Sequence, residues 1–239
     1  MSEPNPWDAP TLPLPGDVVP PPDAPTKKAR PKPWVWVTWI TGLLANKQLC
    51  VWQSWFKAHY MKYDKVAEPN FDLAAWSVEH DALVKARAQS MVEDGRKVTY
   101  ESQNSFYLHG ESAVLSGKPD LISKKQGTST RVSDGKSGEQ NNKDWWQVLV
   151  YLFAIPLAWK NPAMQIHGEV FYKDGTYIYI EPEELTAARR AEIVRVIKLV
   201  SSDVEPEKTP NWDDCRRCDI AECPVRALEP KPDILTSEF

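Results

Sequence analysis

Strand-like segments follow one another between residues 97 and 134, and this run limits the fold more than any other feature of the sequence. The segments are short and are interrupted by glycines. Helical spacing of apolar residues precedes and follows the run. Strands and helices in this order predict an α/β domain, a mixed sheet flanked by helices. The expected strands are 97–108, 112–117, 119–123, 130–134, 164–172 and 176–182, the last two as a hairpin, and the expected helices are 74–91, 143–158 and 183–200.

Aromatic residues gather before this run. Trp52, Trp55, Phe56 and Tyr60 recur at helical spacing. The pattern favours an amphipathic helix whose aromatic face lies against the core. The alternative is that these rings serve as stacking platforms for nucleic-acid bases.

Composition divides the chain into a folded part and two tails. Residues 1–33 contain 11 of the 21 prolines, which predicts a disordered tail. Residues 34–228 then form one domain, and residues 229–239 form an acidic tail; a partner-docking peptide is the alternative for either tail. We find no apolar stretch of membrane-spanning length and no charged-then-apolar leader, so we expect a cytoplasmic protein with no membrane partner.

The net charge limits how the chain could bind nucleic acid. Its formal value is −4, whereas proteins that coat nucleic acid by bulk charge carry a strong basic excess. Any contact with nucleic acid is therefore expected to be local. Five basic residues near the motifs described next could guide a phosphate backbone, although a solvated surface explains them equally well: Lys118, Lys124, Lys125, Arg131 and Lys143.

Two aspartates and a lysine stand close together in the strand run. Asp120 lies in "SGKPDLI", and Asp134 and Lys136 lie in "VSDGK". Residues i and i+2 on a strand share a face, so Asp134 and Lys136 project together, and a hairpin would bring Asp120 alongside. Two carboxylates repel unless a divalent cation lies between them. A lysine beside them could position a water or offset charge on a phosphate during hydrolysis.

Gln147 and Tyr151 extend this group onto the next helix. They are four residues apart and so share a face, which would pack over the end of the sheet that carries the acids. Each motif alone is weak, because a D-x-K pair is common on surfaces and Gln147 and Tyr151 suit any helix. The argument therefore depends on all of the motifs occurring in this order.

The segments "GKPD", "DGK" and "QVLVY" resemble the successive motifs of the PD-(D/E)XK nuclease superfamily, specifically its RecB-like branch. The resemblance implies a restriction-endonuclease-like fold. It implies that Asp120, Asp134 and the backbone carbonyl of Gly135 bind Mg²⁺ or Mn²⁺. It also implies that Lys136 is the catalytic lysine.

The same resemblance assigns roles to helical residues. Gln147 and Tyr151 match the motif typical of the RecB-like branch. Family members often add a metal-binding histidine on the helix before the sheet, and "VEHDALV" offers His80 at that place; a structural histidine is the alternative. The other histidines have no matching context: His59, His109 and His167.

Four cysteines suggest a second metal centre. Cys50 lies far upstream, and "CRRCDIAECP" contains Cys215, Cys218 and Cys223. A Cys-x2-Cys step lets two thiolates reach one metal from a tight turn, and the other two cysteines could complete four ligands. Disulfides are the alternative, and a reducing cytosol disfavours them. Ligand type alone leaves zinc and an iron–sulfur cluster open.

One cysteine before the acidic motifs and three after them are similar to the pattern in cluster-bearing members of the RecB-like branch. These members include AddB-type nucleases and CRISPR-associated iron–sulfur exonucleases, and "VTWITGLLANKQLCVWQSWF" is similar to their segment around the first cysteine. The resemblance implies a [4Fe–4S] cluster that joins the two ends of the domain. Zinc is the less favoured occupant.

The sequence thus predicts a Mg²⁺- or Mn²⁺-dependent deoxyribonuclease, an exonuclease acting on single-stranded DNA or free ends in repair, recombination or CRISPR adaptation. Protein partners in such assemblies are expected. The main alternative is a non-catalytic DNA-binding or adaptor subunit, although a scaffold has no need to hold two repelling carboxylates together. A third hypothesis is a zinc-stapled, restriction-type endonuclease.

Overall fold

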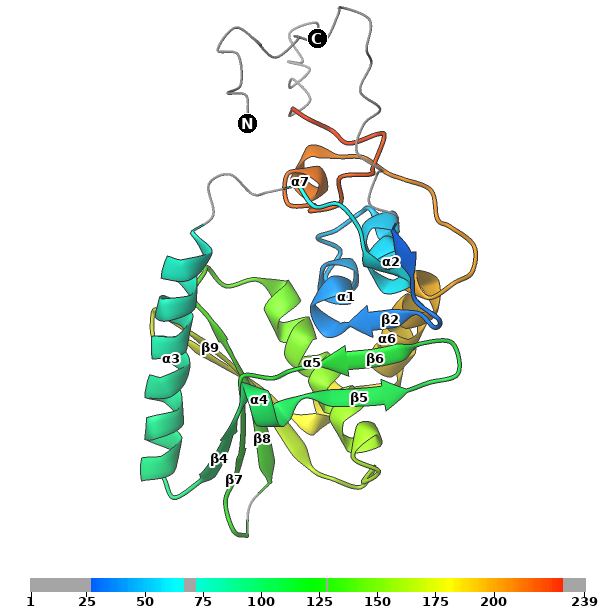
Figure 1. Cartoon of the computed structure of the whole chain (residues 1–239). Coiled ribbons are helices and arrows are strands. Elements are labelled where there is room, and N and C mark those ends of the chain that lie inside the picture. Colours follow the sequence, from blue (N-terminus) through cyan, green and yellow to red (C-terminus); the bar gives the residue numbers. More distant parts are fainter. Residues whose placement is uncertain (1–26, 67–71, 128, 230–239) are drawn as a thin grey trace, which may run out of the picture.

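The central sheet has five strands and positions the site described below. In the computed structural model, which describes residues 27–66, 72–127 and 129–229, these strands lie in the order β10-β9-β8-β7-β4 (Figure 1). Neighbours are antiparallel except β8 and β9, which are parallel, so the predicted mixed sheet is confirmed. The strands are β4 (Lys97–Tyr100), β7 (Leu121–Lys124), β8 (Thr130–Lys136), β9 (Ile166–Tyr172) and β10 (Tyr177–Ile180).

Two hairpins within this sheet follow the predicted pattern. β7 pairs with β8, Leu121 opposite Ser133 and Ile122 opposite Val132. Asp120 directly precedes β7, so this register carries it toward the end of β8. β9 and β10 form the second hairpin.

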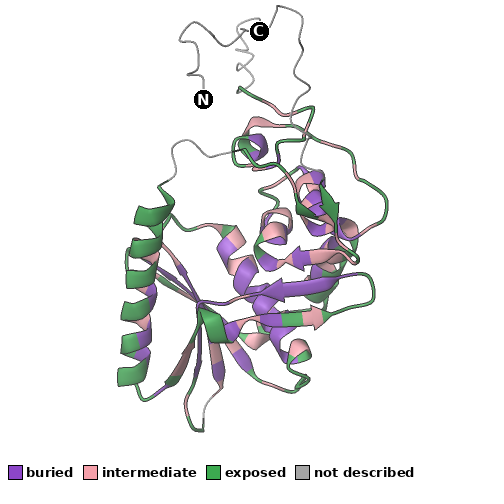
Figure 2. Cartoon of the chain, viewed as in Figure 1, coloured by how far each residue is buried: buried purple, intermediate pink, exposed green. Residues whose placement is uncertain are grey.

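Two helices cover opposite faces of the sheet. On one face, α5 (Asn142–Ala158) approaches β9 so closely that a Cβ on Gly168 would lie 2.5 Å from Val148. On the other face, apolar residues of α3 (Leu73–Glu93) form a cluster with Phe171. Figure 2 shows the difference in burial: α5 is largely enclosed, while the outer side of α3 is exposed. These helices confirm the flanking layers expected from the sequence.

A second sheet and further helices complete the core. The order of its strands is β2-β6-β5, with β2 parallel to β6. Buried residues of α1 and α6 belong to the same apolar cluster as those of α5, so one core joins the two sheets. The additional elements are β2 (Trp34–Trp36), β5 (Phe106–His109), β6 (Val114–Gly117), α1 (Val37–Leu44), α2 (Val51–His59), α6 (Ala187–Val200) and α7 (Trp212–Cys215).

The predicted aromatic helix is α2, and its large rings face inward. Trp52, Trp55 and Phe56 are 3 %, 6 % and 1 % exposed. The indole Nε1 of Trp55 donates to the carbonyl of Ser202 at 2.7 Å, which satisfies the polar edge of the ring. The core-facing interpretation is confirmed for these three residues, whereas Tyr60 begins a short strand, β3 (Tyr60–Lys62).

The structure differs from the predicted elements at two places. The segment expected as one strand over 97–108 is broken by α4 (Glu101–Asn104), because the buried Asn104 amide donates to main-chain carbonyls and turns the chain. The helix expected from 183 begins later: Pro182–Glu184 form a 3-10 turn, and α6 follows with Thr186 as its N-cap. The Thr186 side chain, which accepts from the backbone N–H of Arg189, thus fixes the start of α6 after the residue at which the sequence pattern predicted it.

The described residues include only a small part of the two predicted tails. Residues 1–26 and 230–239 lie outside the described residues, so most of both tail predictions is not addressed. Lys28–Ala29, which the tail prediction included, instead form β1 and pair with β3. Among the described residues, none of the helices has the length and apolar character needed to cross a membrane.

Candidate active site

Asp120 and Asp134 lie at the same end of the β7–β8 hairpin and line one cavity of about 410 Å³. Both are buried, Asp134 to 2 % exposure. Asp120 Oδ2 accepts a hydrogen bond from the backbone N–H of Gly135 at 2.6 Å, which fixes one strand's carboxylate to the other strand. A Cβ at Gly135 would lie 2.8 Å from the ring of Phe171, so glycine permits this close packing. The structure thus brings the two predicted acids together.

His80 reaches the same cavity from α3. Its Nε2 lies 3.5 Å from Asp120 Oδ1, and its ring stacks on Trp76 with centroids 5.1 Å apart. The interaction with the Asp120 carboxylate raises the pKa of His80 above its usual value, against the effect of burial. His80 is therefore where the sequence motif placed it, and its role as a metal ligand stays a prediction.

Gln147 connects the second acid to the lysine. Its Nε2 donates to Asp134 Oδ1 at 2.8 Å and to the Tyr151 hydroxyl at 3.0 Å, and its Oε1 accepts from Lys136 Nζ at 3.0 Å. Lys136 Nζ also lies 2.5 Å from Asp134 Oδ2. The face of α5 that carries Gln147 and Tyr151 thus packs over the acids, as expected.

Burial and neighbouring charges shift the pKa values of Asp134 and Lys136. Burial raises the pKa of Asp134 to about 7, Lys136 opposes the rise, and Asp120 adds to it. Burial alone would lower the pKa of Lys136, but the Asp134 carboxylate outweighs it, so the pKa of Lys136 is raised and the lysine stays an ammonium. A cation bound at the acids would favour the charged form of Asp134.

Three carboxylates that the sequence analysis did not select also line the cavity: Glu101, Glu139 and Asp144. Asp144 is buried and accepts a hydrogen bond from the Tyr172 hydroxyl at 3.3 Å. It lies in the first turn of α5, where acids are common because of the helix dipole, so the sequence offered no signal that it would face the acids.

The donor types at this site fit a divalent cation. Asp120, Asp134 and the carbonyl of Gly135 offer the oxygen ligands that Mg²⁺ and Mn²⁺ prefer, and His80 offers a nitrogen. Across the described residues, no group of three or more His, Cys, Asp or Glu side chains converges closely enough to hold a metal ion. The ligand set therefore stays a prediction, made on donors that share a cavity.

The four cysteines also come together. All are free thiols, and all line one small cavity of about 10 Å³, room for roughly one water molecule. The two regions of chain are joined by Asp214, whose Oδ2 accepts from the backbone N–H groups of Leu49 and Cys50 at 2.9 Å each. Arg226 fixes the loop by donating to the carbonyls of Cys215, Cys218 and Ile220. The sequence had not indicated either residue.

Thiolate donors suit both iron–sulfur clusters and zinc, so this donor set fits either group. In the part of the chain that the structure describes, no three of these thiols converge closely enough to hold a single metal ion. The cluster itself stays a prediction.

The predicted backbone-guiding residues separate into two groups. Lys118 and Lys143 line the active-site cavity. The others have partners elsewhere: Lys124 lies over the Trp159 ring, Lys125 pairs with Asp94, and Arg131 pairs with Glu169. Of the histidines without a motif, His59 stacks on Trp55 and His167 pairs with Glu181, and neither these nor His109 line the cavity.

Comparison with known proteins gives one family match. A family model described as "PD-(D/E)XK nuclease superfamily" matches residues 44–224, a stretch that includes the acidic motifs and all four cysteines. No curated protein matches the chain. Among solved structures, one described as "Crystal structure of SSO0001" is 16 % identical, covers 64 % of this chain and 72 % of its own, and superposes with a TM-score of 0.41.

Proposed function

The chain belongs to the PD-(D/E)XK nuclease superfamily, and on that premise we propose that it is a Mg²⁺- or Mn²⁺-dependent deoxyribonuclease of the RecB-like branch. The observation that carries the proposal is the cavity that Asp120, Asp134 and Lys136 share with Gln147. A buried pair of acids is costly to hold without a cation, so their placement in an open cavity favours catalysis over a scaffold role.

Asp120, Asp134, His80 and the carbonyl of Gly135 would hold the divalent ion, which when bound supplies Lewis-acid polarisation of a phosphate oxygen. The protein's own contribution is to fix these donors. Gly135 N–H orients Asp120, and the Gln147 amide orients Asp134. Preorganised donors lower the barrier because they need not rearrange during the reaction.

Lys136 is the residue that faces the reacting atoms as a cation. Its ammonium lies between Asp134 and Gln147, so it can orient a water and stabilise negative charge that develops on the phosphate. In hydrolysis the water oxygen forms a bond to phosphorus and loses a proton, the P–O bond to the leaving oxygen breaks, and that oxygen gains a proton. Tyr151 acts through Gln147 and is a positioning residue.

We also propose that the four cysteines bind a [4Fe–4S] cluster. Support comes from the shared cavity of the free thiols and from the resemblance of their order to cluster-bearing members of the branch. The same resemblance supports an exonuclease that acts on single-stranded DNA ends, in the cytoplasm, within repair, recombination or CRISPR adaptation.

The test is cleavage of labelled DNA by purified protein with Mn²⁺ or Mg²⁺. Linear single strands should be shortened from an end, while closed single-stranded circles should stay intact. Lys136→Ala should abolish cleavage and keep the wild-type circular dichroism spectrum, whereas the exposed Lys198→Ala on α6 should cleave like the wild type. DNA binding without cleavage in every divalent ion would contradict the proposal and favour a non-catalytic subunit.

A further inference from the structure

A second polar cavity, of about 320 Å³, adjoins the candidate active site on the side of α7. Thr38 and Lys143 line both cavities, so the two have a common wall. The rest of the second cavity is lined mainly by hydroxyl, amide and charged side chains, and none of the described residues that line it is aromatic. Such walls suit a polar, hydrated ligand rather than stacked bases.

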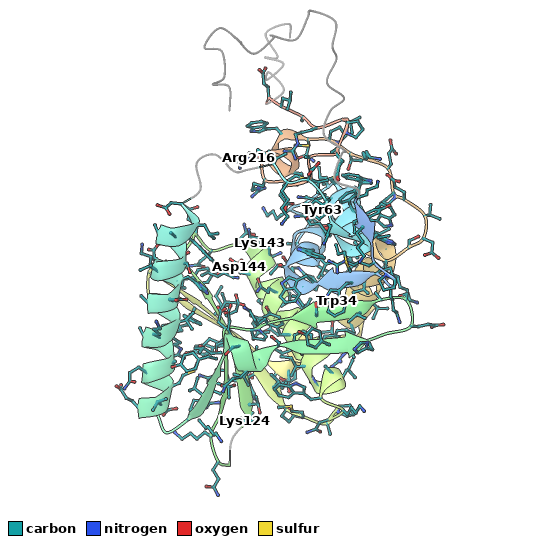
Figure 3. All side chains as sticks on the ribbon, viewed as in Figure 1. Trp34, Tyr63, Lys124, Lys143, Asp144 and Arg216 are labelled. Atoms are coloured by element: carbon teal, nitrogen blue, oxygen red, sulfur yellow. The ribbon has the colours of Figure 1, made fainter. Side chains whose placement is uncertain are left out.

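Three cationic side chains line this second cavity: Lys47, Lys143 and Arg217. None of them forms a salt bridge with another of the described residues. Figure 3 shows Lys143 with Asp144 at the start of α5, and Arg216, the neighbour of Arg217, on the segment across from them. The cations thus come from three separate parts of the chain and face one space.

The two acids of the same cavity are already engaged. Asp214 is buried, and its Oδ2 accepts from two backbone N–H groups and, at 2.7 Å, from the Asn211 amide. Asp213 lies 3.5 Å from the guanidinium Nε of Arg216. Arg217 Nε donates to the backbone carbonyl of Asp213 at 3.0 Å, so its remaining N–H groups, together with the ammonium groups of Lys47 and Lys143, can face a ligand.

The amino end of α5 adds to the positive field where the cavities meet. Asn141, which lines the second cavity, caps this helix by accepting from the backbone N–H of Lys143 at 3.1 Å. The first turn of a helix carries partial positive charge, which favours phosphate. The amino end of α5 and the ammonium group of Lys143 thus both place positive charge where the two cavities meet.

We propose that the second cavity binds the phosphate backbone of single-stranded DNA next to the nucleotide being cut. The strand would leave the acids past Lys143 and continue toward Lys47 and Arg217. This assignment rests on the proposed nuclease function and adds the path of the substrate to it. Because Arg217 lies inside the Cys215–Cys218 step, the path also connects DNA binding with the cysteine loop.

The test is equilibrium binding in the non-cleaving Lys136→Ala background. Fluorescein-labelled oligothymidylates of about 4 and about 12 nucleotides are titrated by anisotropy at several salt concentrations. Lys47→Ala/Arg217→Ala should weaken the longer ligand more than the shorter one. The plot of log K for association against log salt has a negative slope, and each single-strand phosphate contact contributes about 0.7 to its magnitude. Loss of the two contacts should therefore reduce the magnitude of this slope by about 1.4.

The matched control is Arg195→Ala/Lys198→Ala, which removes the same charge from exposed positions on α6 that line neither cavity. This control should keep the slope and the length dependence of the parent. If Lys47→Ala/Arg217→Ala also keeps both while the wild type cleaves DNA, the path is wrong and the nuclease proposal stands. If the wild type neither binds nor cleaves any DNA, both proposals fail.

Discussion

Gln147 Nε2 donates a hydrogen bond to Asp134 Oδ1 at 2.8 Å, across the contact between α5 and β8. The same side chain accepts from Lys136, so one amide fixes both the acid and the cation. Its position is in turn held by the hydroxyl of Tyr151. The geometry of the proposed catalytic group therefore depends on an uncharged side chain of the neighbouring helix α5.

Gln147→Ala should lower kcat for DNA cleavage by about 10²-fold, because Asp134 and Lys136 would lose the amide that positions them and a small misplacement of catalytic groups lowers the rate by about that factor. KM should change little, since the amide need not touch the substrate. Steady-state kinetics with Mn²⁺ checks the split between kcat and KM. Gln165→Ala, an exposed glutamine before β9, is the control and should match the wild type. Wild-type kcat in Gln147→Ala would contradict the positioning role.

The fully buried carboxylate of Glu169 holds two guanidinium groups against the sheet. Arg87 Nε and Nη2 donate to it at 2.9 and 2.5 Å, and Arg131 Nη1 lies 3.4 Å away. Glu169→Ala leaves these cations without a buried partner and should lower the free energy of unfolding by about 3–5 kcal/mol. Urea denaturation measures this free energy, and the exposed Glu207→Ala is the control. If Glu169→Ala lost no more free energy of unfolding than Glu207→Ala, the buried ion pairs would not stabilise the fold as described.

Asp214 links the segment around Cys50 to the one around Cys215. Asp214→Ala leaves the buried N–H of Cys50 and that of Leu49 without an acceptor, at about 1–3 kcal/mol for each buried group. We expect a lower melting temperature and, if the thiols bind iron, less iron per chain. The neighbouring Asp213→Ala, which breaks an exposed pair with Arg216, should show neither effect. Equal melting temperatures for the two variants would show that Asp214 does not join the segments.

The Asp219 carboxylate should make the cysteine region sensitive to acid. Burial alone would raise the pKa of Asp219, but the ammonium groups of Lys57 and Lys65 outweigh it and hold the pKa below its usual value. A depressed carboxylate pKa stabilises the fold above the unfolded pKa of about 4, and the stabilisation is lost as pH falls through the folded pKa. The difference in melting temperature between wild type and Asp219→Asn should therefore shrink below about pH 4. A difference that is constant with pH would refute this.

The parts of the site that sequence predicted are those set by local rules. Strand alternation placed Asp134 with Lys136, the short connection between β7 and β8 brought in Asp120, and helical spacing aligned Gln147 with Tyr151. Each of these relations is fixed within a few residues or one hairpin.

The parts that sequence did not predict depend on contacts between distant segments. Arg87 and Glu169 meet across 82 residues, and Cys50 and Asp214 across 164. No local pattern specifies such partners. The strand expected over 97–108 was wrong at α4, where two of the three carbonyls that accept from the Asn104 amide belong to Pro119 and Asp120, outside the segment.

The central claim is that Asp120 and Asp134 share one divalent ion, and Mn²⁺ binding followed by electron paramagnetic resonance tests it most directly. The wild type should bind Mn²⁺ with a signal that both Asp120→Asn and Asp134→Asn greatly weaken, while Asp203→Asn, an exposed aspartate far along the chain, should leave it unchanged. Undiminished Mn²⁺ affinity in Asp134→Asn would contradict the account.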